Sequence, residues 1–164
     1  MAKWFKLFSN QYLGFWILGL VLFAIQEIPY MVMPLLKLKT NPIMNMTETS
    51  PSLDILEKIL GSLCIAFMIF IVNKNTSFFD IGTSIQKIAF ISMIVVLLLN
   101  FIGWGLYFKG FQSIGIMMFF IVLLPPLYYV FIGIWRQNWI LVYTGITFLF
   151  VHTIHVYKNL TYNG

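Results

Sequence analysis

Five apolar segments, each about as long as a bilayer is thick, constrain the fold of this chain more than any other feature. A hydrocarbon core of about 30 Å needs roughly 20 residues of apolar helix at 1.5 Å per residue. Backbone polar groups inside lipid must also be paired within the segment, which favours helices. We therefore predict an all-α integral membrane protein, a single compact bundle of five transmembrane helices. The predicted spans are residues 12–36, 53–72, 88–108, 114–135 and 139–157.

The amino-acid composition agrees with a membrane protein. Hydrophobic residues make up 60% of the 164 residues and charged residues only 9%, whereas soluble proteins average about 25% charged residues. No polar stretch exceeds about 20 residues, and a separate soluble domain usually needs more than about 50. Residues 1–164 are therefore predicted to form one transmembrane helical domain.

The second segment is the least regular of the five. Three charged residues near its start shorten its uninterrupted apolar part to residues 59–72, about 14 residues. Ser50 and Pro51 just before it are nevertheless typical of a helix start. If this helix does not cross the membrane, the alternative is a bundle of four spans. The charged residues are Asp54, Glu57 and Lys58.

The ten basic residues stand singly between the apolar segments. Recognition of a phosphate backbone needs a basic cluster, so we predict the lipid bilayer, and not nucleic acid, as the surroundings of this chain. With the N-terminus inside, five basic residues fall on each side of the membrane, which is a tie. Lys3 and Lys6 ahead of the first span favour a cytoplasmic N-terminus. We predict a multi-pass protein of the plasma membrane.

Glu27 is an acidic residue inside the first apolar segment. A carboxylate near the bilayer midplane costs at least ~2.5 kcal/mol to insert, so it normally faces a protein interior or a wet cavity and serves a function. Gln26 precedes it, and Pro29 and Pro34 follow, each removing a backbone donor and favouring a kink. An interrupted helix beside an ionisable group is typical of an intramembrane binding site. A protonated carboxyl with a structural role is the alternative.

Polar side chains on the first, third and fifth segments fall at a similar depth, because these segments run in the same direction. At 1.5 Å per residue, Glu27, Asn100, His152 and His155 lie about 22, 18, 20 and 24 Å from one face. Asn100 also suits a hydrogen bond between helices, and the histidines suit simple solvation, although their spacing permits metal ligation or proton relay. The predicted ligand-binding residues are Gln26, Glu27, Tyr30, Asn100, Trp104, His152 and His155.

The sequence contains no nucleotide-binding, zinc-protease or serine-hydrolase motif. Its single cysteine, Cys64, has no partner for an intrachain disulfide. Two Met-x-Met pairs near the first loop suit Cu(I), but packing explains methionines in so apolar a chain more simply. We therefore predict no cofactor, no resident metal and no catalytic residues.

Four functions are compatible with these features. The first is binding or handling of a lipid-like or cationic small molecule, with Glu27 as its counter-ion. The second is an accessory or assembly subunit, joined to itself in a homo-oligomer or to a larger membrane complex. A proton- or cation-coupled transporter is the third, and a membrane enzyme with Glu27 and His152 as an acid–base pair is the fourth. The sequence favours the first two over transport, and transport over catalysis.

Overall fold

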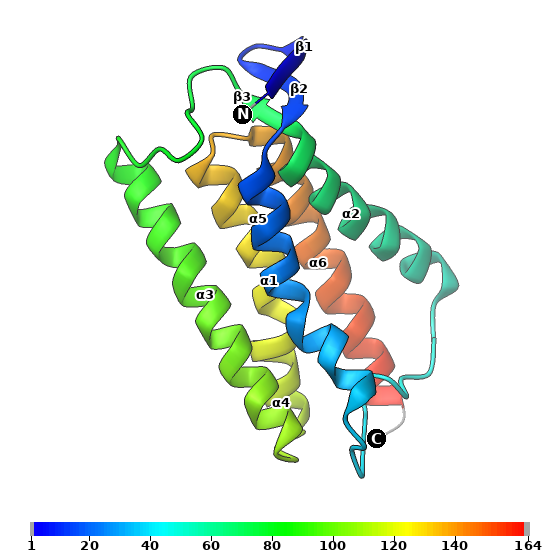
Figure 1. The fold of residues 1–164 in the computed structure, drawn as a ribbon. Coiled ribbons are helices and arrows are strands. Elements are labelled where there is room, and N and C mark those ends of the chain that lie inside the picture. Colours follow the sequence, from blue (N-terminus) through cyan, green and yellow to red (C-terminus); the bar gives the residue numbers. More distant parts are fainter. Residues whose placement is uncertain (1, 163–164) are drawn as a thin grey trace.

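The computed structural model of the chain describes residues 2–162, and most of them are helical. The described residues form five long helical rods. The rods make a bundle, and a small sheet lies at one end of it (Figure 1). The fourth of these rods is continuous and consists of α4, the π-helix η2 and α5. The helices are α1 (Ile17–Val32) with the 3-10 turn η1 (Met33–Leu35), α2 (Pro51–Phe70), α3 (Ser84–Phe108), α4 (Ile114–Ile116), η2 (Met117–Leu123), α5 (Leu124–Trp135) and α6 (Trp139–Tyr162).

Within residues 2–162, four rods are long and apolar enough to cross a membrane. This confirms the predicted all-α bundle with helices that can cross a membrane. By length and composition, the number of candidate spans is four, which is the alternative to the predicted five. Helix α2 falls outside the set because its three charged residues lie near its start. The four candidate spans are Ile17–Leu35, Ser84–Phe108, Ile114–Trp135 and Trp139–Tyr162.

The rods pack in a row in which α3 contacts α5, α5 contacts α6, and α6 contacts α2. Helix α1 lies against this row, and α2 leans away from the other helices toward its start (Figure 1). The two short turns, residues 109–113 and 136–138, make neighbouring rods antiparallel, as their lengths predict. The main core includes the buried side chains Met68, Met93, Tyr128, Ile132, Trp135 and Leu141.

A three-stranded antiparallel sheet, which the sequence reading missed, covers one end of the bundle. Strands β1 (Ala2–Phe8) and β2 (Gln11–Phe15) form a hairpin, and β3 (Ile71–Asn73) adds to β2 directly after α2. Ser9 turns the hairpin with a positive φ of 46°. The first predicted span therefore begins five residues too early, at 12 instead of 17. Aromatic side chains in β1 and β2 suit a strand as well as a membrane segment, so hydropathy alone does not separate the two.

The turn between α5 and α6 ties the sheet end together. Arg136 is buried there, and its Nη2 donates to Oγ1 of Thr76 at 3.1 Å and to the carbonyl oxygen of Ser77 at 2.7 Å. Its guanidinium also lies 4.6 Å from the centre of the Trp16 ring. Nδ2 of Asn138 donates to the carbonyl oxygen of Phe67 in α2 at 2.9 Å and to that of Ile71 at the start of β3 at 3.1 Å. These contacts hold α2, α6 and the 74–83 loop in one arrangement.

The π-helix η2 explains the position of Asn100. Each carbonyl of a π-helix accepts from the N–H five residues later, and for Phe120 that residue is Pro125, which has no N–H. The side-chain Nδ2 of Asn100 donates to this carbonyl oxygen at 2.8 Å. One turn along α3, a Cβ added to Gly103 would lie 2.1 Å from Cβ of Phe120. Asn100 and Gly103 therefore fit α3 closely against an interrupted helix.

Candidate functional site

A pocket of about 170 Å³ lies between α1, α2, α5 and α6. Its walls combine a few polar groups with apolar and aromatic side chains, which is the usual make-up of a small-molecule site. The polar lining comes from Gln26, Glu27, Tyr129 and His152. The apolar lining includes Ile65, Pro125 and Phe148.

Tyrosines of α5 hold the side of α1 that carries the pocket. The hydroxyl of Tyr129 donates to Oε1 of the buried Gln26 at 2.9 Å, and the hydroxyl of Tyr128 donates to the carbonyl oxygen of Leu22 at 3.1 Å. The interhelical bond satisfies the Gln26 amide oxygen, as a buried polar group requires. Glu27, the next residue, is thereby placed at the pocket.

The Glu27 carboxylate is half-buried and lines this pocket. Within residues 2–162, no group forms a hydrogen bond or ion pair with it. A carboxylate held away from bulk water is stabilised by an opposing charge or by a donor. The pocket beside it is therefore suited to a ligand that supplies one.

The structure brings together four of the seven residues that the sequence assigns to a ligand site, namely Gln26, Glu27, Tyr30 and His152. Trp104 is buried behind them and packs edge-to-face on Tyr30, with ring centres 4.7 Å apart. Two other predicted residues lie elsewhere. Asn100 bonds to η2 as described above, and His155 is buried in a separate polar group.

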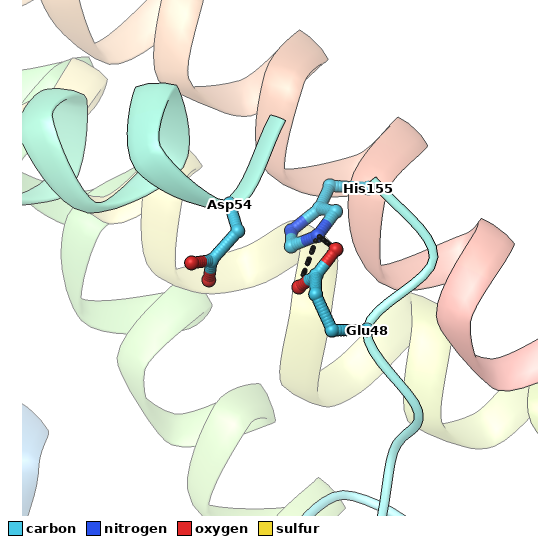
Figure 2. Close-up of side chains that lie close together, drawn as sticks. All are labelled: Glu48, Asp54 and His155. Carbon is cyan, nitrogen blue, oxygen red and sulfur yellow. Dashed lines mark hydrogen bonds and ion pairs between the residues drawn. The ribbon is translucent and has the colours of Figure 1, made fainter. Parts of the chain in front are cut away.

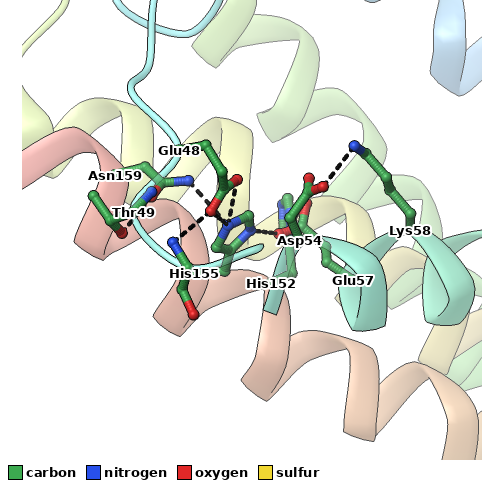
Figure 3. A network of polar contacts seen from close by, with 9 residues as sticks. Glu48, Thr49, Asp54, Glu57, Lys58, His152, His155 and Asn159 are labelled. Carbon is green, nitrogen blue, oxygen red and sulfur yellow. Dashed lines mark hydrogen bonds and ion pairs between the residues drawn. The ribbon is translucent and has the colours of Figure 1, made fainter. Parts of the chain in front are cut away.

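That polar group is the His–carboxylate cluster, which we define as Glu48, Asp54, Glu57, His152 and His155 (Figure 3). His152 and His155 are one turn apart on α6, and Asp54 and Glu57 are one turn apart on the facing helix α2. Glu48 comes from the loop before α2. Three separate parts of the chain thus meet at one point.

Glu57 lies between the two histidines. Its Oε1 is 2.9 Å from Nδ1 of His152, and its Oε2 contacts Nδ1 of His155. The other ring nitrogen of His155, Nε2, lies 2.9 and 3.0 Å from the two carboxylate oxygens of Glu48. Asp54, near the start of α2, lies beside them, with a carboxylate oxygen within 4.8 Å of ligand atoms of Glu48 and His155 (Figure 2). One buried imidazole is therefore surrounded by three acidic side chains.

The loop before α2 is fixed to α6 beside this imidazole. The backbone N–H and the hydroxyl of Thr49 donate to Oδ1 of Asn159 at 3.0 and 2.7 Å. Nδ2 of Asn159 lies 3.0 Å from Nε2 of His155. On the outer side, Nζ of Lys58 pairs with Asp54 at 2.7 Å. The hydrogen bond from His155 lowers the pKa of Glu48 below its ordinary value, so this exposed carboxyl stays ionised to lower pH.

The sequence reading missed the acidic half of this cluster. It treated Asp54 and Glu57 as charges that shorten the second apolar segment, and it assigned Glu48 no role. One signal was present, because Asp-x-x-Glu and His-x-x-His carry the same i, i+3 spacing on two antiparallel helices. Their alignment depends on how far each helix extends, and hydropathy leaves those bounds uncertain by a turn.

The chain matches no protein-family model, no curated protein and no solved structure. What the pocket and the cluster can bind therefore follows from their own residues, distances and burial.

Proposed function

We propose that this protein binds an amphipathic small molecule with a cationic head group, and that the head group sits beside Glu27. The observation that carries this proposal is the half-buried Glu27 carboxylate, which lines the pocket without a partner among residues 2–162. A positive charge in the pocket offsets the unfavourable free energy of holding a carboxylate at membrane depth. An ammonium group is the simplest ligand group of that kind.

The pocket walls support a quaternary or primary ammonium. Tyr30, Tyr129 and Phe148 line the space next to the carboxylate, and aromatic faces attract cations. Ile65 and Pro125 offer apolar surface to the first methylene groups of a tail. The volume of about 170 Å³ is below the roughly 300 Å³ of a drug-sized site, so it suits a head group and not a whole lipid.

Thermal unfolding of the full chain in a mild non-ionic detergent tests the proposal. The probe is hexyltrimethylammonium, and the neutral probe of matched shape is 2,2-dimethyloctane, in which a carbon atom replaces the charged nitrogen. We expect the cation to raise the Tm of the wild type in a saturable way and the neutral analogue to raise it much less. Glu27→Gln keeps the shape of the side chain and should weaken the response to the cation at least about tenfold in concentration.

Asp80→Asn provides the matched control, because this acid lies in the loop at the sheet end, where its Oδ1 accepts from the N–H of Gly82. The control should respond to hexyltrimethylammonium as the wild type does. Equal responses of the wild type and Glu27→Gln would reject the proposal. A response that is the same for the charged and the neutral probe would reject it as well.

A further inference from the structure

We propose that the His–carboxylate cluster binds one divalent first-row transition-metal ion, of the class of Zn²⁺ or Mn²⁺. The ligands are the carboxylates of Glu48 and Asp54 and Nε2 of His155. None of these three ligands lines the Glu27 pocket, and neither proposal depends on the other. The sequence alone predicts no metal, because it does not place the three acids beside the histidines.

The ligand atoms already lie close to one another. One atom each from Glu48, Asp54 and His155 fall within 4.8 Å of one another (Figure 2). Around a tetrahedral ion with bonds of about 2.0–2.2 Å, neighbouring ligand atoms are about 3.3 Å apart. Glu48 reaches that range from Nε2 of His155 at 2.9 Å, so a modest side-chain rotation of Asp54 completes the set. A fourth position is left for water.

Glu57 supplies the hydrogen bond that orients a metal-binding histidine. Metal-bound histidines usually donate their second ring N–H to a carboxylate or carbonyl, which fixes the tautomer. Glu57 accepts from Nδ1 of His155 in this way and leaves Nε2 to face Glu48. The amide Nδ2 of Asn159 also lies 3.0 Å from the same Nε2.

The charges around His155 need a cation. Without a proton or a metal ion on Nε2, the electron pair of this nitrogen faces two carboxylate oxygens of Glu48. A proton would make His155 an imidazolium between Glu48 and Glu57, which is a purely structural ion-pair network. A metal ion replaces that proton and also gives Asp54 a partner besides the exposed Lys58.

The donor set and its exposure decide which ion fits. One imidazole with two carboxylates suits Zn²⁺, Mn²⁺ or Fe²⁺ better than Mg²⁺ or Ca²⁺, which prefer oxygen alone. The Glu48 side chain is 38% exposed, whereas that of His155 is 5% exposed. An ion can therefore enter from the loop side and reach a buried nitrogen.

A Mn²⁺ titration of the chelator-treated full chain in detergent, followed by electron paramagnetic resonance, tests this site. Free Mn²⁺ gives a strong signal that binding broadens, so the titration yields both the stoichiometry and the Kd. We expect one Mn²⁺ per chain, displaced by equimolar Zn²⁺ but not by a tenfold excess of Mg²⁺. Glu48→Gln and Asp54→Asn should each raise the Kd at least about tenfold, and Glu57→Gln about 10- to 100-fold.

Two variants act as controls for charge alone. Asp80→Asn removes an acid at the sheet end and should leave the Kd unchanged. Lys58→Gln frees Asp54 from its ion pair and should keep or tighten Mn²⁺ binding. Circular dichroism and size-exclusion chromatography check that Glu48→Gln and Asp54→Asn, both at accessible positions, remain folded. The proposal is overturned by absent stoichiometric binding, by a Kd that neither folded variant changes, or by equal displacement with Mg²⁺.

Discussion

Nδ1 of His152 lies 2.9 Å from Oε1 of Glu57, and this contact joins the two candidate sites. His152 lines the pocket beside Glu27, whereas Glu57 belongs to the His–carboxylate cluster and also holds His155. The pair therefore fixes α2 against α6 at the point where the pocket and the cluster meet.

Glu57→Gln should destabilise the fold clearly. The substitution removes the negative charge that both histidines contact, and hydrogen bonds to charged groups contribute about 1.5–3 kcal/mol. Lys58→Gln, at the next residue, breaks an ion pair whose lysine is 73% exposed and should change stability very little. Thermal unfolding of both variants in one detergent, with chelator present, measures the difference. Equal losses would show that Glu57 has no special role.

Glu48 should make part of the stability depend on pH. Its pKa is lowered from the usual 4.5, first by the hydrogen bond with His155. A carboxyl with a lowered pKa stabilises the folded chain above its unfolded pKa and loses that contribution as the pH falls through the folded value. We expect the Tm difference between wild type and Glu48→Gln, without metal, to be largest near pH 6 and to shrink progressively as the pH falls below the usual value of 4.5. A difference that stays constant over this range would contradict the assignment.

Gly103→Ala should disrupt the contact between α3 and η2. The new Cβ would lie 2.1 Å from Cβ of Phe120, a distance that forces the backbones apart and costs about 1–3 kcal/mol or more. Gly105→Ala is the matched change on the same helix, since nothing lies within 4 Å of its added Cβ. That variant should be neutral or slightly stabilising, because alanine favours helix over glycine. Similar Tm values for both variants would show that α3 does not approach η2 so closely.

Arg136→Gln should loosen the sheet end of the bundle. It removes the charged bonds to Thr76 and Ser77 and the cation that lies over Trp16. Arg136→Lys keeps the charge but not the planar fork, so it should restore only part of the lost stability. Backbone amides of residues 74–83 should exchange their hydrogens faster in Arg136→Gln than in Arg136→Lys. Unchanged exchange in that loop would argue against the role given to Arg136.

The sequence predicted the helices well, because length and hydropathy decide them. The rod at residues 114–135 has the predicted bounds, whereas α3 begins four residues early because Thr83 and Gln86 form a capping box. The hairpin of β1 and β2 was missed because its aromatic residues fit a strand and a membrane segment equally. Side-chain pairing across helices is a tertiary property, and a local spacing predicts it only when the bounds of both helices are known.

The candidate site was likewise predicted where helix length decides a residue's position, and missed where tertiary contacts decide it. Glu27 and His152 were placed at one level from helix length alone, and both line one pocket. Glu48 was missed because it lies in a loop, where depth along a helix has no meaning. Asn100 was grouped with the ligand site because depth does not reveal which face of α3 it occupies.

The position of a bound cation is the most direct test of the proposed function. A structure of the full chain with a bromine-labelled alkyltrimethylammonium would locate both ends of the probe. We expect the ammonium within about 4–6 Å of the Glu27 carboxylate and of a lining aromatic ring, with the labelled tail leading out of the pocket. A probe bound elsewhere, or a Glu27 side chain that turns away from the pocket toward lipid, would contradict the account.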